Sequence, residues 1–460
     1  MSDRPSAPGT GSRLDRYVEL YAARTKGMTA SEVRALFAVA SRPEVVSLAG
    51  GMPYVSALPL EAVGDAVRDL LVHRGAQALQ YGSGQGDQTL REQIAGLLMP
   101  LVGVTEAHPD DIVVTVGSQQ ALDLITRVFC DPGDVVIAEG PSYVTAMSTF
   151  AAYQCEVVHV PMDSEGLQPE ALREAITSVR GAGKRPKFLY TIPSFQNPGG
   201  VTQGAQRRRE VLAVAQEADL LVVEDDPYGL LGFDGSVPRA LRADDHEGVI
   251  YMGSFSKTLA SGLRVGWAVA PHGVREKLVL AAEASVLCPS AYSQLTVSTY
   301  LATQPWWEQI KSFRELYRER RDALLDQLAL SMPPGCSWTK PEGGFFSWVT
   351  LPEGLDSKAM LPRAVTARVA YVPGTGFYAG EAVALGRPYM RLSYCFPEPE
   401  RIREGVRRLA GVIEEELDLM ETFGPAYGLG AATGDAAAPG TRLASRPADP
   451  YGAAPGPDLA

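Results

Sequence analysis

The chain has 460 residues, 45% of them hydrophobic, and a formal net charge of −12 at neutral pH. Its length allows two or three structural units of about 150 residues, and its acidic balance argues against a nucleic-acid partner, which needs a basic face. No stretch reaches the run of about 20 apolar residues that a membrane span requires, and the first residues lack the apolar centre of a signal peptide. The five cysteines are scattered without a Cys-x-x-Cys pair, so reduced thiols in the cytoplasm are expected. The five histidines lack metal-ligand spacing, and no metal site is expected.

The pattern along the chain predicts five segments. Residues 1–13 are expected to be disordered, and residues 14–60 to form a helix and an extended arm that packs with a small domain. From 61 to 305, β-type runs alternate with helical stretches, which predicts a large α/β domain with a mostly parallel sheet and helices on both faces. Residues 306–423 are expected to form a linking helix and a smaller α+β domain. Residues 424–460 are rich in Ala, Gly and Pro and are expected to be a disordered tail.

The first motif of the large domain lies at residues 111–122. A β-type run there turns through Gly117 and Ser118 into an amphipathic helix with Leu122 and Ile125 on one face. The free amides and the dipole at such a helix start attract anions. Many α/β turns share this pattern, so it indicates a phosphate site only together with other motifs.

Two later runs place polar groups at strand ends. Residues 188–200 pass from a β-type run into a Pro- and Gly-rich loop that carries Asn197, although Asn-Pro-Gly is also an ordinary turn sequence. Residues 220–229 contain four apolar residues followed by three acids, and Asp225 stands three positions before Tyr228. A buried carboxylate here suits a pyridine nitrogen, which it keeps protonated and electron-poor. Capping of a turn or helix is the alternative interpretation of these acids.

The lysine at the centre of residues 253–266 carries the most specific chemistry. Lys257 follows a β-type run and lies between small hydroxyl residues, with Arg264 seven positions on. A lysine forms a Schiff base where desolvation or positive charge lowers its pKa. Ser254, Ser256 and Arg264 are groups that bind a phosphate. The motif therefore indicates a Schiff base with pyridoxal 5′-phosphate (PLP), whereas the alternative is a solvated loop lysine.

The last third of the chain is expected to hold a helix near 306–330 and strands at 343–349 and 390–394. A closing helix shows an apolar stripe from Ile402 to Leu417. Arg391 lies in the second of these strands. It is either a surface salt-bridge residue or a binder of a carboxylate.

The order of these motifs resembles that of the fold-type I PLP-dependent aminotransferases of class I/II. Residues 47–53, 80–82, 139–143 and 390–394 also fall where that family carries its motifs, and the resemblance covers roughly residues 20 to 420. It looks closest to the branch of 2-aminoadipate and broad-specificity aminotransferases, which also supplies the effector domain of MocR-type regulators. The resemblance implies a large PLP-binding domain with a mostly parallel sheet flanked by helices, plus a smaller α+β domain.

The resemblance also implies a role for each site residue. Lys257 would hold PLP and shuttle the substrate proton, and Asp225 would pair with the ring nitrogen. Asn197 and Tyr228 would bond the 3-oxygen of the ring. The other cofactor ligands would be Tyr143 on the ring face and, around the phosphate, Ser118, Gln119, Ser254, Ser256 and Arg264.

Substrate and partner follow from the same resemblance. Arg391 would clamp the substrate α-carboxylate beside Asn197, and Gly51 would leave room for it. Tyr81 would reach the phosphate of a neighbouring subunit, which implies a homodimer with shared active sites. Arg24 is a candidate contact for an acidic substrate side chain, and a solvated helix arginine is the alternative.

The implied reaction is ping-pong transfer of an amino group between an L-amino acid and a 2-oxo acid. One alternative keeps PLP but changes the reaction to that of a β-lyase, decarboxylase or racemase. The other is a MocR-like regulator, which needs an N-terminal winged-helix domain. The residues ahead of Ser47 instead match the enzyme's own N-terminal arm.

Overall fold

The computed structural model describes residues 17–28 and 42–423. The segments predicted to be disordered, 1–13 and 424–460, lie outside the described residues, as does most of the expected N-terminal helix. Within 17–28 the backbone forms only the short 3₁₀ turns η1 (Val18–Leu20) and η2 (Ala23–Gly27).

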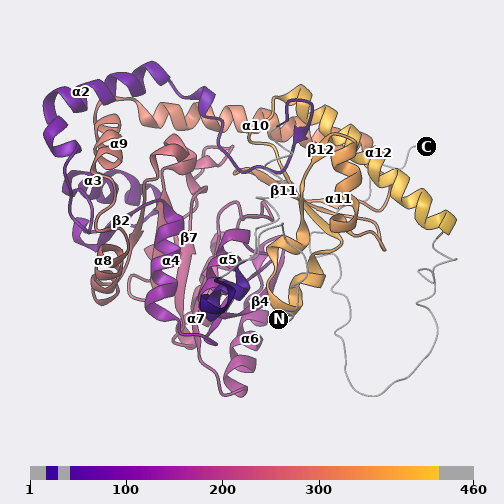
Figure 1. Cartoon of the computed structure of the whole chain (residues 1–460), viewed down its shortest axis with the longest axis horizontal. Coiled ribbons are helices and arrows are strands. Elements are labelled where there is room, and N and C mark those ends of the chain that lie inside the picture. Colours follow the sequence, from indigo (N-terminus) through magenta and orange to yellow (C-terminus); the bar gives the residue numbers. More distant parts are fainter. Residues whose placement is uncertain (1–16, 29–41, 424–460) are drawn as a thin grey trace, which may run out of the picture.

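The centre of the molecule is an eight-stranded sheet with the order β2-β9-β8-β7-β6-β3-β4-β5 (Figure 1). Strands β8, β7, β6, β3 and β4 pair in parallel, whereas β9 runs antiparallel between β2 and β8, and β5 is a short antiparallel edge. The mostly parallel sheet predicted from the sequence is confirmed. The strands are β2 (Ile112–Thr115), β3 (Val135–Gly140), β4 (Glu156–Asp163), β5 (Gly166–Leu167), β6 (Pro186–Thr191), β7 (Leu221–Asp225), β8 (Val249–Ser254) and β9 (Gly266–Val269).

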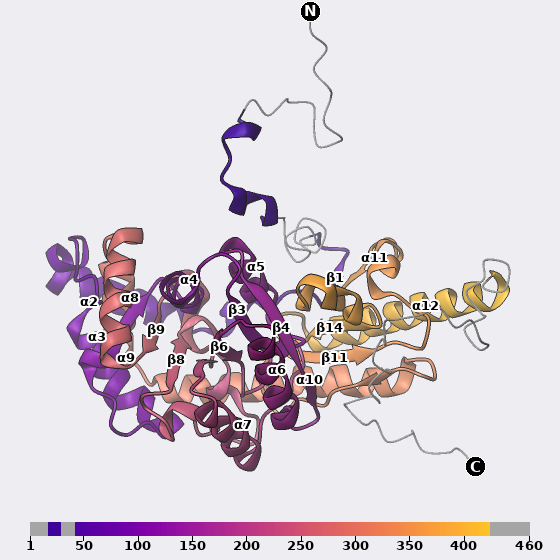
Figure 2. The same cartoon turned by 90° about the horizontal axis from the view of Figure 1, so that it is seen from below.

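Helices cover both faces of this sheet, because its central strands are apolar on both sides. One apolar cluster packs α4, α5 and α8 against the sheet, and a second packs α6 and α7 against the opposite face (Figure 2). These helices are α4 (Ser118–Phe129), α5 (Val144–Ala152), α6 (Pro169–Gly181), α7 (Ala205–Glu217) and α8 (His272–Val286). Three others, α2 (Leu60–Ala78), α3 (Gln88–Gln93) and α9 (Ala291–Thr303), gather near the β2 end of the sheet (Figure 1).

A long helix, α10 (Trp306–Ser331), leads into the C-terminal part of the chain. There an antiparallel sheet has the order β10-β11-β14-β13. The arm strand β1 (Val46–Ser47) pairs in parallel with β12 (Val369–Ala370) beside it. The remaining elements are β10 (Ser337–Trp338), β11 (Phe346–Thr350), α11 (Ser357–Thr366), β13 (Val372–Pro373), β14 (Tyr389–Ser393) and α12 (Pro399–Phe423).

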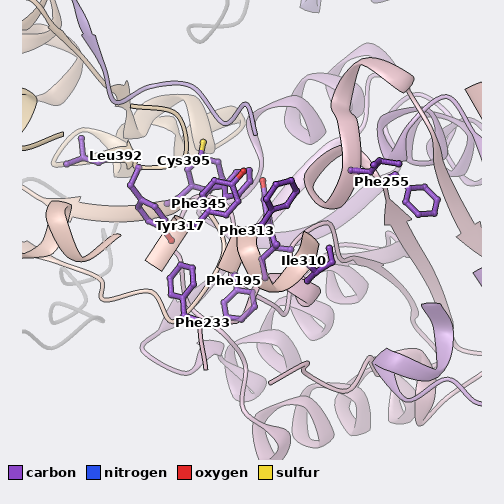
Figure 3. Close-up of a cluster of buried hydrophobic side chains, with 14 of the residues drawn as sticks. Phe195, Phe233, Phe255, Ile310, Phe313, Tyr317, Phe345, Leu392 and Cys395 are labelled. Atoms are coloured by element: carbon purple, nitrogen blue, oxygen red, sulfur yellow. The ribbon is translucent and has the colours of Figure 1, made fainter. Parts of the chain in front are cut away.

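One continuous aromatic cluster joins the two sheets (Figure 3). Phe195 comes from the loop after β6, Phe313 and Tyr317 come from α10, and Phe345 directly precedes β11. The rings of Tyr317 and Phe345 lie 4.7 Å apart between centroids. Since a close-packed core resists displacement, the cluster fixes the smaller sheet beyond the carboxyl ends of the large sheet's parallel strands. Within the described residues, no helix is both long and apolar enough to cross a lipid bilayer.

Candidate active site

A cavity of about 370 Å³ opens at the carboxyl ends of the parallel strands, where ligands bind in open α/β sheets. It is lined by every predicted site residue except Tyr81 and the candidate substrate contact Arg24: Gly51, Ser118, Gln119, Tyr143, Asn197, Asp225, Tyr228, Ser254, Ser256, Lys257, Arg264 and Arg391. Tyr81 follows α2 and is 77% exposed, away from this cavity. Residues separated by up to 340 positions in the chain therefore meet in one site.

Lys257 lies just after β8, at the start of a short π-helical turn, Ser256–Ala260. Its Nζ donates a hydrogen bond to the carbonyl oxygen of Gly51 at 2.7 Å. Burial lowers the pKa of this amine to about 8, with further lowering by the guanidinium groups of Arg391 and Arg264. The lowered pKa makes Lys257 a better nucleophile than an ordinary lysine, which is what Schiff-base formation requires.

This pKa makes the capture of PLP by the cofactor-free protein pH-dependent. Only the neutral amine attacks an aldehyde, so we expect the rate to rise about tenfold per pH unit below about pH 8 and to level off above it. Stopped-flow absorbance in the visible range measures this rate. A rate that stayed constant between about pH 6 and 9 would contradict a Lys257 pKa of about 8.

Asp225 ends β7 and is only 6% exposed. Its Oδ2 accepts a hydrogen bond from the Tyr190 hydroxyl at 2.7 Å, whereas its buried Oδ1 has no hydrogen-bond partner among the described residues. Burial raises the pKa of this carboxyl to about 7, against the opposing effect of the Tyr190 hydrogen bond. A buried acceptor without a donor is costly, so Oδ1 fits an incoming N–H such as that of a protonated pyridine ring.

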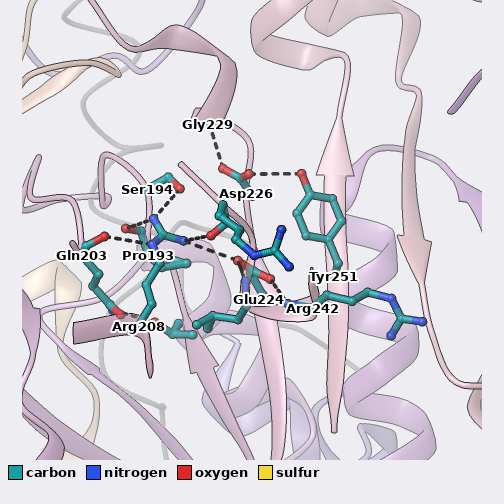
Figure 4. Close-up of polar contacts among 12 residues, drawn as sticks. Pro193, Ser194, Gln203, Arg208, Glu224, Asp226, Gly229, Arg242 and Tyr251 are labelled. Atoms are coloured by element: carbon teal, nitrogen blue, oxygen red, sulfur yellow. Dashed lines mark hydrogen bonds and ion pairs between the residues drawn. The ribbon is translucent and has the colours of Figure 1, made fainter. Parts of the chain in front are cut away.

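The two acids beside Asp225, Glu224 and Asp226, accept hydrogen bonds from other parts of the protein (Figure 4). Glu224 accepts from the amides of Leu241 and Arg242 at 2.9 and 3.1 Å and lies 3.7 Å from Arg208. Asp226 accepts from the Gly229 amide at 2.8 Å and from the Tyr251 hydroxyl at 3.1 Å. The capping interpretation of the acidic run is therefore correct for Asp226, and Asp225 is the acid of the three that lines the cavity.

The opposite end of the cavity is built to hold an anion. Helix α4 begins at Ser118, after Gly117 turns the chain with a φ of +73°. The Arg264 guanidinium lies 3.4 Å from the Ser256 hydroxyl and 3.4 Å from the Val116 carbonyl oxygen. A helix N-terminus, a guanidinium and serine hydroxyls together suit a phosphate.

Gly266 controls the close approach of β9 to this helix start. A Cβ at Gly266 would lie 2.5 Å from the Ser118 amide nitrogen, which is backbone and cannot rotate away. We expect Gly266→Ala to lower the free energy of unfolding by about 1–3 kcal/mol and to weaken PLP binding. Urea unfolding and a PLP titration measure the two effects. Gly262→Ala is the control, because a Cβ there meets nothing within 4 Å, and equal effects of the two variants would contradict the steric argument.

Arg391 projects from β14 into the cavity and is 3% exposed. Its Nη1 donates to Asn197 Oδ1 at 2.8 Å and its Nη2 to the Ala49 carbonyl oxygen at 2.6 Å. The guanidinium also lies over the Phe346 ring, 4.1 Å from the centroid. Burial lowers its pKa to about 10, and in the described part of the chain no carboxylate lies within ion-pair distance of it. The positive charge of Arg391 is therefore not neutralised by a carboxylate of the described residues.

Aromatic side chains shape the wall beside Arg391. The buried Tyr228 ring meets Phe345 and Phe346 edge to face at 5.4 and 5.9 Å. Gly51 lines the cavity as expected, and a Cβ at this position would come within 2.8 Å of the Phe346 ring. Gly51 is thus required for a contact within the protein.

Glu139 is a site-supporting residue that the sequence reasoning missed. This buried carboxylate at the end of β3 accepts from the Ile192 amide at 3.2 Å and from Gln196 Nε2 at 2.9 Å. Gln196 Oε1 accepts in turn from the Gly199 amide at 2.6 Å. These bonds hold the loop that carries Asn197. The available signal was an acid at the end of an apolar β-type run.

Arg24, the candidate contact for an acidic substrate side chain, lies outside the lining of this cavity, and so does Tyr54 of the arm. Arg24 is exposed in η2, close enough to Tyr153 at the end of α5 to influence it electrostatically. Tyr54 packs its ring against the guanidinium of Arg320 at 4.0 Å.

The carboxyl edge of this sheet brings together a lysine of lowered pKa, an aspartate oxygen that has no donor among the described residues, and a cradle for an anion. These features fit a PLP enzyme of fold type I. The family model "Aminotransferase class I and II" matches residues 43–409, and the chain belongs to this family. It is a PLP-dependent aminotransferase. This agrees with the activity, cofactor and fold that the sequence predicts.

Several characterised proteins are similar to the chain over most of its length. Aromatic-amino-acid aminotransferase 1 of Thermococcus litoralis is 43% identical, over 87% of this chain and 95% of that protein. The 2-aminoadipate transaminase of Thermus thermophilus is 38% identical, over 85% and 96%. The crystal structure of Pyrococcus horikoshii kynurenine aminotransferase, in complex with PMP, superposes with a TM-score of 0.83 at 41% identity, over 88% and 99%.

Proposed function

We propose that Lys257 is the base of this transamination and that Arg391 anchors the amino acid by its α-carboxylate. When bound, PLP supplies an electron sink that makes the substrate Cα–H acidic. The Lys257 amine would take this proton from the substrate Cα, hold it at Nζ and give it back later in the transfer. Its lowered pKa keeps it able to accept a proton near neutral pH.

The remaining residues would hold the cofactor in a fixed position relative to the Lys257 amine. Asp225 would accept from the ring nitrogen through its free Oδ1, while Asn197 and Tyr228 would bond the ring oxygen and Tyr143 would cover the ring face. The phosphate would be held by Ser118, Gln119, Ser254, Ser256 and Arg264.

The observation that carries this proposal is the buried, unneutralised charge of Arg391. Among the described residues, this guanidinium bonds an amide oxygen and a carbonyl oxygen but no carboxylate. A charge removed from water in this way is unfavourable without an anion. Its planar fork matches the two oxygens of a carboxylate.

The test compares Arg391→Gln with wild type on amino acids and on primary amines that lack the carboxylate. We expect kcat/KM to fall about 10²–10³-fold for amino acids and to change little for the amines. Arg387→Gln, an exposed arginine of the same segment, is the control. Equal losses on both donor classes would refute carboxylate binding by Arg391.

We also propose that the preferred donors carry aromatic or large apolar side chains. Among the described lining residues not assigned above, none is charged: Met52, Val144, Thr145, Ile192, Pro227, Ser261 and Phe346. The similarity to aminotransferases named for aromatic amino acids and kynurenine supports the same choice. A panel of aromatic, aliphatic and acidic donors with 2-oxoglutarate and pyruvate tests it. A tenfold preference for acidic donors would refute it.

A homodimer with shared active sites completes the proposal. Large apolar side chains stay exposed along α2 and its C-terminal turn, at Leu71, Val72 and Leu79, and at the end of α8, at Leu287. Tyr81 adjoins the first group. Light scattering should give twice the chain mass, and Tyr81→Phe should weaken PLP binding without dissociating the dimer.

A further inference from the structure

Tyr190 is a buried tyrosine that does not line the cavity but contacts Asp225, one of the predicted cofactor ligands. It lies on β6, is fully buried, and packs its ring edge to face against Phe150, at 5.7 Å between centroids. Its hydroxyl donates to Asp225 Oδ2 at 2.7 Å. Tyr190 is absent from the residues that line the cavity, so any effect it has on the cofactor must pass through Asp225.

The surroundings of Asp225 explain why such a donor matters. Burial and the nearby carboxylates of Asp226 and Glu139 raise the pKa of Asp225, whereas the Tyr190 hydroxyl and the Lys257 amine lower it. Tyr190 is the neutral group in this set that donates directly to the carboxylate. A donor to one oxygen makes the whole carboxylate less basic.

We propose that Tyr190 is a positioning residue that fixes Asp225 with Oδ1 facing the cofactor and keeps the shared proton on the ring nitrogen. The proposal rests on the role of Asp225 proposed above. With Oδ2 occupied by the hydroxyl, Oδ1 is the oxygen left for the ring N–H. Without the hydroxyl, the more basic carboxylate would draw the proton from the ring nitrogen, and its plane would be free to turn.

The chain supplies a matched control on the other side of the same strand. Strand β7 lies between β6 and β8, and Tyr251 on β8 donates to Asp226 Oδ2 at 3.1 Å. Tyr251 is 3% exposed. Tyr190→Phe and Tyr251→Phe thus each remove one buried hydroxyl from one of two consecutive acids, while the aromatic rings that fill the core remain.

The experiment loads wild type and both variants with PLP labelled with ¹⁵N in the ring and records the nitrogen chemical shift. For Tyr190→Phe we expect the signal to move toward that of neutral pyridine and the PLP dissociation constant to rise about tenfold. The visible absorption band should also titrate at a higher pH. A less electron-poor ring would leave the Lys257 nitrogen that is bonded to the cofactor more basic. Tyr251→Phe should match wild type in the nitrogen shift.

Two outcomes separate failure of this inference from failure of the proposed Asp225 role. If Asp225→Asn moves the nitrogen signal but Tyr190→Phe matches wild type, Tyr190 does not position Asp225. If Asp225→Asn itself leaves the signal unchanged, Asp225 does not pair with the ring nitrogen, and the inference falls with it. A shift of equal size in Tyr251→Phe would also overturn the inference, since the effect would not be specific to Asp225.

Discussion

Lys257→Ala is expected to lower kcat for transamination by at least about 10³-fold, because one substitution removes both the covalent attachment and the proton carrier. Among the described residues that line the cavity, no second amine could replace it, since the other cations, Arg264 and Arg391, are guanidinium groups that stay protonated. Steady-state kinetics and single-turnover conversion of an amino acid to its 2-oxo acid measure the loss.

The control for this variant is Lys277→Ala, an exposed lysine on α8. Borohydride reduction followed by peptide mapping adds an independent readout, with the pyridoxyl group expected on the peptide that contains Lys257. Transamination by Lys257→Ala at the wild-type rate, or a label on another lysine, would contradict the assignment.

Asp225→Asn is expected to lower kcat about 10²–10³-fold, because the neutral amide cannot hold a positive charge on the ring nitrogen. The substitution keeps the shape of the side chain, so loss of packing contributes little. The neighbouring acids do not replace it, since Glu224 and Asp226 accept from backbone amides and from Tyr251.

The same variant has an opposite effect on the stability of the cofactor-free protein. Burial raises the pKa of Asp225 from about 3.8 to about 7, so the native carboxyl is a stronger base than the unfolded one. Wild type therefore loses stability relative to Asp225→Asn as pH rises from about 4 to about 7, with no further loss above that. Urea unfolding across this range measures the difference. A difference between wild type and Asp225→Asn that stayed flat across this range would contradict the raised pKa of Asp225.

The sequence was sufficient for the sheet and for the residues at its edge, for a physical reason. In a parallel sheet the loops that follow successive strands meet at one edge, so motifs around Ser118, Asn197, Asp225 and Lys257 must converge once their strands are recognised. Strand β9 was not predicted. It runs antiparallel between β8 and β2, and four residues carry too little pattern to show it.

The supporting contacts could not be predicted, because they depend on side-chain directions set by tertiary packing. Tyr190 is one apolar-looking residue of a β-type run until β6 pairs with β7 and brings its hydroxyl to Asp225. Phe346 likewise reads as a strand residue, and its contact with Gly51 joins positions almost 300 residues apart.

The backbone of the arm around Ala49 and Gly51 contacts both the Arg391 guanidinium and the Lys257 amine. The Ala49 carbonyl accepts from Arg391, the Gly51 carbonyl accepts from Lys257, and the Cys395 thiol lies 3.1 Å from the Met52 carbonyl oxygen. Substitutions in this arm that are meant to change substrate selectivity will therefore also affect these two groups. A shift of its peptide planes would change the position of the Arg391 guanidinium and the orientation of the Lys257 amine at the same time. Variants of the arm should therefore be screened for both carboxylate binding and catalysis.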